Sequence, residues 1–133
     1  DQRDLHSFPT RRSSDLPEQT DTMMGVSPAQ AADALGSAGA GMIGCNCGMG
    51  IANYVKVVRL LRRATSLPIW AKPNAGLPEL SGGAVVYKES PGEFAAQVPA
   101  LIEAGANVVG GCCGTTPEHI KAIVAMLSKR GGR

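Results

Sequence analysis

The chain has 133 residues, enough for one domain, and 44% of them are hydrophobic, a level typical of a globular protein and not of a disordered segment. The formal net charge is +2, and no basic stripe interleaved with aromatic residues runs along the chain, which argues against a nucleic-acid partner. No apolar run reaches the roughly 18 residues of a membrane span, and no apolar core of a signal peptide follows the N-terminus. We therefore expect a cytoplasmic protein with no membrane partner.

The first segment of the chain is expected not to belong to the fold. Residues 6–16, HSFPTRRSSDL, match no helix or strand pattern, and they resemble the translation of a common sequencing-library adapter. We expect residues 1–16 to be a non-native leader and residues 17–133 to be the C-terminal portion of a native domain. An ordinary basic, Ser-rich leader is the alternative. In either case His6 is assigned no chemistry.

Four helices are predicted, and three of them have a recognisable start. Ser27, Ser90 and Thr116 each place a hydroxyl at the N-cap, and each is followed by a proline that fits the first helical turn. Three short apolar runs lie between the helices and suit strands covered on both faces. In chain order the predicted elements are helix 28–38, strand 42–45, helix 51–65, strand 69–72, helix 91–104, strand 107–110 and helix 117–129.

This alternation of helices and strands predicts an α/β fold with a parallel sheet. An internal repeat supports it, because AGAGMIGCNCG at 38–48 aligns with AGANVVGGCCG at 104–114, two βα units later. Repeated βα units fit a (β/α)8 TIM barrel, and a doubly wound open sheet is the alternative. Three strands cannot close a barrel of eight. We therefore expect the C-terminal part of a barrel: about three βα units and a leading helix.

Four cysteines stand at the C-terminal ends of predicted strands: Cys45, Cys47, Cys112 and Cys113. In a barrel these strand ends converge on one mouth, so Cys47, Cys112 and Cys113 are predicted to present three thiolates to one zinc ion. Three protein ligands leave a fourth position open, where a substrate thiol would bind as the thiolate and keep its nucleophilicity. Cys45 is interpreted as a small core residue.

Two other interpretations of the cysteines stay open. Each thiol can be a small buried core residue without chemistry. The adjacent pair Cys112 and Cys113 can also act as a redox pair, because a disulfide between neighbouring cysteines is strained and labile. The corresponding rival functions are a zinc-binding module without catalysis and a thiol redox protein.

Four motifs resemble the homocysteine S-methyltransferase domain, the family of cobalamin-dependent methionine synthase and betaine–homocysteine methyltransferase. They are MGVSP at 24–28, GCNCG at 44–48, KPNAGLP at 72–78 and GGCCGTTPEHI at 110–120. The last motif is highly specific, whereas the Asn-Cys-Gly element alone is weak. The resemblance extends from about Thr22 to Leu127.

The resemblance implies a TIM barrel whose sixth and eighth strands end in the zinc ligands Cys47, Cys112 and Cys113. It also implies an enzyme in which the zinc-activated thiolate of homocysteine attacks a methyl donor and gives methionine. The donor can be a methylated corrinoid such as methylcobalamin, S-methylmethionine, S-adenosylmethionine or betaine. The family binds the amino and carboxylate groups of homocysteine largely through the N-terminal half of the barrel, so we expect the 133 residues alone to be inactive.

Four further residues carry expectations. The side-chain oxygen of Asn74 is placed to reach the open coordination position, as a fourth ligand or substrate-site residue, and a role in fixing the turn is the alternative. His119 is expected to cap a helix or lie on the surface. Tyr87 is expected in a loop over the barrel mouth or in packing at its rim, and Trp70 between the sheet and a helix.

Overall fold

The computed structural model describes residues 20–131, so the predicted leader at 1–16 lies outside the described residues. The helices and strands follow one another in the predicted order, with one addition, the hairpin β3–β4. The elements are α1 (Pro28–Ser37), β1 (Ile43–Cys47), α2 (Ile51–Ala64), β2 (Ile69–Pro73), β3 (Pro78–Ser81), β4 (Ala84–Tyr87), α3 (Pro91–Ala104), β5 (Val108–Val109) and α4 (Pro117–Gly131). Within residues 20–131 every helix is too short or too polar to cross a membrane.

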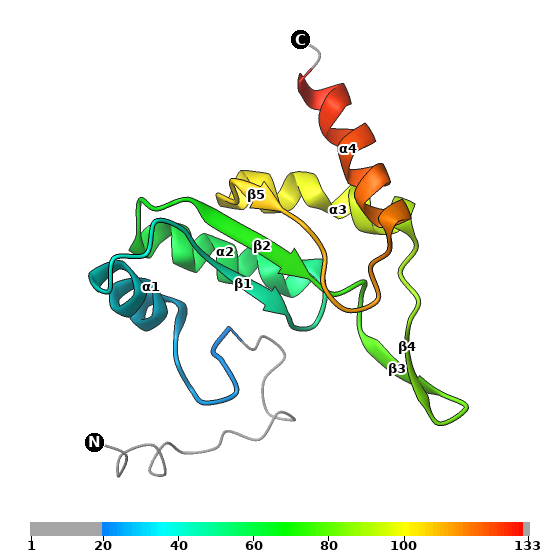
Figure 1. The fold of residues 1–133 in the computed structure, drawn as a ribbon, viewed down its shortest axis with the longest axis horizontal. Coiled ribbons are helices and arrows are strands. Elements are labelled where there is room, and N and C mark those ends of the chain that lie inside the picture. The colour runs from blue at the N-terminus through cyan, green and yellow to red at the C-terminus, as the bar shows by residue number, and fades with distance from the viewer. Residues whose placement is uncertain (1–19, 132–133) are drawn as a thin grey trace.

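Strands β1, β2 and β5 form a parallel sheet in that order, with helices packed behind it (Figure 1). Residue Ile43 pairs with Ile69, and Ala71 pairs with Val109, so the three strands run in step. The predicted alternation and the parallel sheet are confirmed. Because β2 lies between β1 and β5, the two cysteine-bearing strand ends flank the end of β2 at one edge of the sheet.

The sheet is covered on one face only within the described part of the chain. Along β2, Ile69 and Ala71 are fully buried against the helices, whereas Trp70 points to the opposite face and is 41% exposed. The prediction that Trp70 packs between sheet and helix is wrong, because side chains alternate along a strand and both of its neighbours occupy the helix side. On the open face the ammonium group of Lys72 lies 4.8 Å from the centre of the Trp70 ring.

Two helices begin with complete capping boxes, as predicted. The Ser27 hydroxyl accepts the backbone N–H of Gln30, whose side chain accepts the N–H of Ser27 in return. Ser90 and Glu93 make the same pair of bonds at the start of α3. The Pro after each serine fixes the first helical turn.

Helix α4 begins with a different closure, in which His119 takes the place of the acidic or amide residue. The backbone N–H of Thr116 donates to Nδ1 of His119 at 3.1 Å, so Nε2 carries the ring proton and donates to the Glu89 carbonyl at 2.8 Å. The ring also packs edge-on against Phe94. The expected capping role is confirmed, but a surface position is wrong, because His119 is 5% exposed. His119 thereby ties the start of α4 to the start of α3.

A single arginine joins the end of α2 to the starts of β2 and β5. Arg62 Nη2 donates to the carbonyls of Thr65 at 2.6 Å and Leu67 at 2.7 Å, and Nη1 donates to Oδ1 of Asn107 at 3.2 Å. The same Asn107 oxygen accepts the backbone N–H of Ile69 at 3.0 Å. This network links the starts of β2 and β5 to the end of α2.

Replacing Arg62 by lysine should lower the free energy of unfolding by about 1–3 kcal/mol, because a point-like ammonium group cannot serve acceptors that lie in different directions. Urea unfolding followed by circular dichroism measures the change. The exposed neighbour Arg63, replaced in the same way, is the matched control. Equal unfolding midpoints for the Arg62→Lys and Arg63→Lys variants would show that the network contributes nothing.

Candidate metal centre

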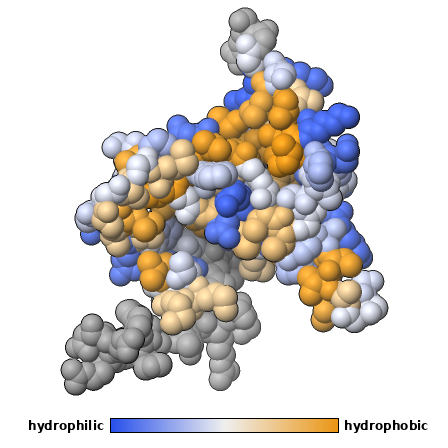
Figure 2. Space-filling view, viewed as in Figure 1, coloured by the Kyte–Doolittle hydropathy of each residue, from blue (hydrophilic) through white to orange (hydrophobic). Residues whose placement is uncertain are grey.

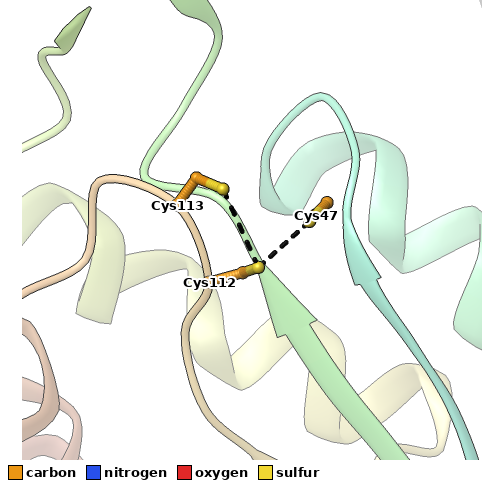
Figure 3. A group of neighbouring side chains, drawn as sticks. All are labelled: Cys47, Cys112 and Cys113. Carbon is orange, nitrogen blue, oxygen red and sulfur yellow. Dashed lines mark hydrogen bonds between the residues drawn. The ribbon is translucent and has the colours of Figure 1, made fainter.

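Three cysteines meet at the C-terminal edge of the sheet (Figure 3). The sulfur of Cys47 lies 3.0 Å from that of Cys112, and the sulfur of Cys112 lies 4.0 Å from that of Cys113. All three sulfurs lie within 4.8 Å of one another. We call these residues the cysteine cluster. The structure therefore brings together the three residues that the sequence predicted as ligands.

The end of β2 is hydrogen-bonded to both cysteine-bearing segments. The N–H of Asn74 donates to the Cys47 carbonyl at 3.2 Å, on the β1 side. On the β5 side, the N–H of Cys112 donates to the Pro73 carbonyl at 3.0 Å, and the N–H of Ala75 donates to the Cys113 carbonyl at 3.0 Å. These bonds continue the parallel pairing past the last strand residues, and they set the separation of the sulfurs.

Cys47 adopts a conformation that side chains other than glycine rarely take. Its φ angle is 66°, in the left-handed region, and Gly48 follows with a φ of 72°. A left-handed conformation costs a residue with a Cβ about 1–2 kcal/mol. The turn moves the Cys47 sulfur toward Cys112, and Nδ2 of Asn46 lies 3.4 Å from that sulfur. The strain therefore falls on a residue of the cluster, as is common at functional sites.

The Asn74 side chain bridges the two cysteine-bearing segments and is 4% exposed. Its Nδ2 donates to the Gly48 carbonyl at 2.9 Å, and its Oδ1 accepts the N–H of Cys113 at 2.9 Å. Both ends of the amide are thus used by backbone groups next to the cluster. The predicted ligand role of Asn74 stays a prediction, while the alternative role of fixing a turn matches these two bonds.

The sulfurs of Cys47 and Cys112 lie within hydrogen-bond distance of each other, at 3.0 Å. The pKa of Cys47 is raised to about 11, mainly by the hydrogen bond with Cys112 and to a smaller extent by desolvation. The same hydrogen bond lowers the pKa of Cys112, because it stabilises the Cys112 thiolate. The two opposite shifts thus come from one contact between the sulfurs, and a cation bound to both sulfurs would displace their protons.

Cys45 does not join the cluster. It packs against the hydrophobic core, and burial raises its pKa to about 12. The strand alternation places it on the same side as Ile43, which faces the helices. The interpretation of Cys45 as a small core residue agrees with this position.

The cysteine cluster fits a zinc ion. Zinc–sulfur bonds of about 2.3 Å in tetrahedral geometry place neighbouring sulfurs about 3.8 Å apart. The observed separations of 3.0 Å for Cys47–Cys112 and 4.0 Å for Cys112–Cys113 bracket this value. Among residues 20–131, the cysteine cluster is the one group of three potential metal ligands whose ligand atoms lie within 4.8 Å of one another. Thiolates are soft ligands, which select zinc over calcium or magnesium.

Comparison with known proteins places the chain in a family. The family model for homocysteine S-methyltransferase matches residues 6–127. The chain belongs to the homocysteine S-methyltransferase family. The resemblance stated from its motifs is therefore confirmed. The match begins inside the predicted leader, whose non-native origin stays a prediction.

Similar proteins include two methionine synthases and one methyltransferase of known structure. The chain is 39% identical to methionine synthase of Mycobacterium leprae over 114 residues and 40% identical to that of Mycobacterium tuberculosis over 113 residues, covering 84% of this chain in each case. It spans only 10% of the length of these curated relatives.

The structural matches are to the homocysteine methyltransferase MmuM from Escherichia coli. The metallated form aligns with a TM-score of 0.63 at 26% identity, covering 83% of this chain and 33% of MmuM. The apo form aligns with a TM-score of 0.62 at 27% identity, covering 84% of this chain and 37% of MmuM. The chain thus corresponds to about a third of the length of these solved structures.

Replacing Asn74 separates a bridging role from a ligand role. Asn74→Asp keeps an oxygen but loses the N–H donor to Gly48, and Asn74→Ala loses both bonds. The bridge predicts that both variants bind zinc about tenfold more weakly or worse, because buried backbone groups lose their partners. Competition with a chromophoric chelator measures the affinity.

A matched control changes an amide to a carboxylate away from the cluster. Gln30→Glu keeps the acceptor of the α1 capping box and should leave zinc affinity unchanged. Zinc affinity in Asn74→Asp equal to or higher than in the unaltered chain would contradict the bridge and support direct ligation.

Proposed function

We propose that this chain is the zinc-binding part of a homocysteine S-methyltransferase. The observation that carries the proposal is the convergence of three sulfurs, from two separate βα units, at one edge of the sheet. Membership of the family supports the reaction class, and the existence of a metallated form of MmuM supports a metal in this family. The whole enzyme's substrates and activity belong to this proposal, because the chain spans a small share of its relatives.

We further propose that β1, β2 and β5 are the sixth, seventh and eighth strands of a (β/α)8 barrel. Their parallel order follows the chain, and helices cover one face of the sheet, as in the wall of a barrel. The other face carries Trp70 and Lys72 and would line the barrel interior. In that arrangement the cysteine cluster lies at the C-terminal mouth, where barrel enzymes place their chemistry.

The proposed ligands are Cys47, Cys112 and Cys113, which leave one tetrahedral position for a substrate sulfur. A zinc ion held by these three cysteines would lower the pKa of the substrate thiol, which would then bind as the thiolate at neutral pH. Asn74 holds the two cysteine-bearing segments together whatever occupies the fourth position. Cys45, with its raised pKa and its place in the core, is left out of the ligand set.

The reaction is a displacement at a methyl carbon. A lone pair on the homocysteine sulfur forms the new carbon–sulfur bond, and the bond between the methyl group and the donor breaks, its electron pair leaving with the donor. The product is methionine. A methylated corrinoid, S-methylmethionine, S-adenosylmethionine and betaine are the candidate donors, and positioning of donor and sulfur accounts for much of the rate.

Metal analysis of the chain tests the ligand set. We expect one zinc per chain and three thiols protected from a thiol reagent, while Cys45 reacts on unfolding. Serine at position 47, 112 or 113 should reduce zinc binding by several orders of magnitude, whereas Cys45→Ser, the matched control, should bind normally.

The rival functions predict other results for the same samples. A chain that binds no metal and forms a reversible disulfide between two cluster cysteines would support the thiol redox protein. The short Cys47–Cys112 separation of 3.0 Å is the feature that would allow it. Equal zinc loss in Cys45→Ser and Cys47→Ser would also contradict the proposed ligand set.

Substrate sulfur binding is tested with cobalt(II) in place of zinc. Homocysteine should increase the sulfur-to-cobalt charge-transfer absorption by about a third, because a fourth sulfur joins three. Homoserine, which carries oxygen in place of sulfur, is the control and should not produce this increase. Identical spectra with homocysteine and homoserine would count against thiol coordination and would leave a zinc-binding module without catalysis.

A further inference from the structure

The amide side chain of Asn46 lies against the sulfur of Cys47, although the two residues are neighbours on one strand. The Nδ2 atom of Asn46 donates to the Cys47 sulfur across 3.4 Å. Adjacent side chains of a regular strand point to opposite faces of the sheet, so two such groups do not meet. The contact therefore requires a break in the alternation of β1, and the break falls at Cys47.

The backbone of Cys47 supplies this break. Along β1 the buried Ile43 and the half-buried Cys45 face the helices, whereas Asn46 is exposed on the open face. Cys47 ends the strand with a φ of 66°, the one positive φ outside glycine among residues 20–131. The left-handed turn brings its sulfur to the Asn46 amide and to within 3.0 Å of the Cys112 sulfur (Figure 3).

Two amide side chains contact the turn at Cys47, and they act on different atoms. Asn74 donates to the Gly48 carbonyl at 2.9 Å, so it holds the backbone that follows the turn. Asn46 donates to the sulfur itself. A hydrogen bond to a sulfur fixes its position, and it also draws electron density from the thiolate form of that sulfur. Asn46 can therefore affect the reactivity of the ligand atom as well as its place.

Asn46 belongs to the open face of the sheet and not to the core. It lines a groove of about 390 Å³ together with Trp70 and Lys72, and it pairs with Lys72 across the strands. Its side chain is exposed, so the packing of the core does not depend on it. A substitution at position 46 therefore removes the contact with the sulfur without opening a cavity in the core.

The ligand sulfurs of a zinc centre of this kind need protection from the methyl donor. Three thiolates exceed the two positive charges of zinc, so all three sulfurs would stay electron-rich. Each of them would compete with the substrate sulfur for an electrophilic methyl group. A ligand sulfur that accepts a hydrogen bond is a weaker nucleophile than one without a donor.

We propose that Asn46 is a positioning residue of the metal centre: its amide donates a hydrogen bond to the Cys47 sulfur, which holds this sulfur toward the other two ligands and weakens it as a nucleophile. The methyl group is thereby directed to the substrate sulfur and away from this ligand. The inference rests on the proposed function, because it assumes that the cluster binds a metal.

The test compares Asn46→Ala with the unaltered chain, both saturated with zinc. Met42→Ala, which shortens another exposed side chain of the same groove, is the matched control. The reagent is methyl iodide, a small electrophile that transfers its methyl group to sulfur and releases iodide, and mass spectrometry follows each cysteine separately.

We expect Cys47 to be methylated about three- to tenfold faster in Asn46→Ala, the effect of one lost hydrogen bond. The rates at Cys112 and Cys113 should change by less than about twofold, because their sulfurs do not contact the lost amide. Zinc affinity should weaken by no more than about tenfold, as for the loss of one group outside the ligand set. Met42→Ala should leave all of these values unchanged.

A cobalt(II) spectrum separates this role from a purely structural one. In Asn46→Ala the sulfur-to-cobalt charge-transfer band should move to longer wavelength, because a thiolate without its donor is more easily oxidised. Asn46→Asp keeps the size of the side chain, removes the donor and adds a negative charge beside the sulfur, so it should move the band at least as far. Met42→Ala should leave the band in place.

Each outcome decides the inference. Unchanged methylation of Cys47 in Asn46→Ala would overturn it, and so would an equal rate increase at all three cysteines, which a general loosening of the site produces. A zinc affinity lowered by much more than tenfold, or an equal band shift in Met42→Ala, would also overturn it. Failure of the unaltered chain to bind zinc or cobalt would overturn the proposed function as well, whereas normal metal binding with no effect of Asn46→Ala would overturn the role of Asn46 alone.

Discussion

The candidate centre depends on the hydrogen bonds that join the end of β2 to the segments on either side of it. Backbone bonds from Asn74 to Cys47 and from Cys112 to Pro73 continue the parallel sheet beyond its last paired residues. The Asn74 side chain adds a bond to each neighbouring segment. The central strand β2 contributes no sulfur, and it sets the distance between β1 and β5. Cys47 at the end of β1 meets Cys112 and Cys113, which follow β5, beyond the end of β2.

The two faces of the sheet differ in the described structure. Helices α2 and α3 cover one face of the sheet, and the other face exposes Trp70, Val108 and part of Met42. Apolar residues also gather on the surface around α4 (Figure 2), where Ile120 and Val124 are exposed. In the proposed barrel, neighbouring βα units would cover such surfaces.

Much of this arrangement was predictable from local patterns. The capping signals of Ser27 and Ser90 gave the helix starts, and the repeat around Cys47 and Cys113 gave the equivalence of the two βα units. The convergence of the cysteines followed from a general property of parallel sheets, in which the carboxyl ends of all strands lie at the same edge. That prediction did not require knowing which strands pair with each other.

The remaining features depend on tertiary contacts. The hairpin β3–β4 was missed, although Gly82 and Gly83, with φ angles of 57° and 81°, form the two-residue turn that such a dipeptide favours. The burial of His119 could not be predicted, because its partner, the Glu89 carbonyl, is 30 residues away in sequence. The packing of Tyr87 against Gly114 depends on the register of the unpredicted hairpin.

X-ray absorption at the zinc edge of the metal-loaded chain tests the central claim most directly. The cysteine cluster predicts three sulfur neighbours at about 2.3 Å and one lighter atom completing the tetrahedron in the absence of a substrate thiol. A coordination shell with one sulfur or none, or one made of nitrogen and oxygen atoms alone, would contradict it.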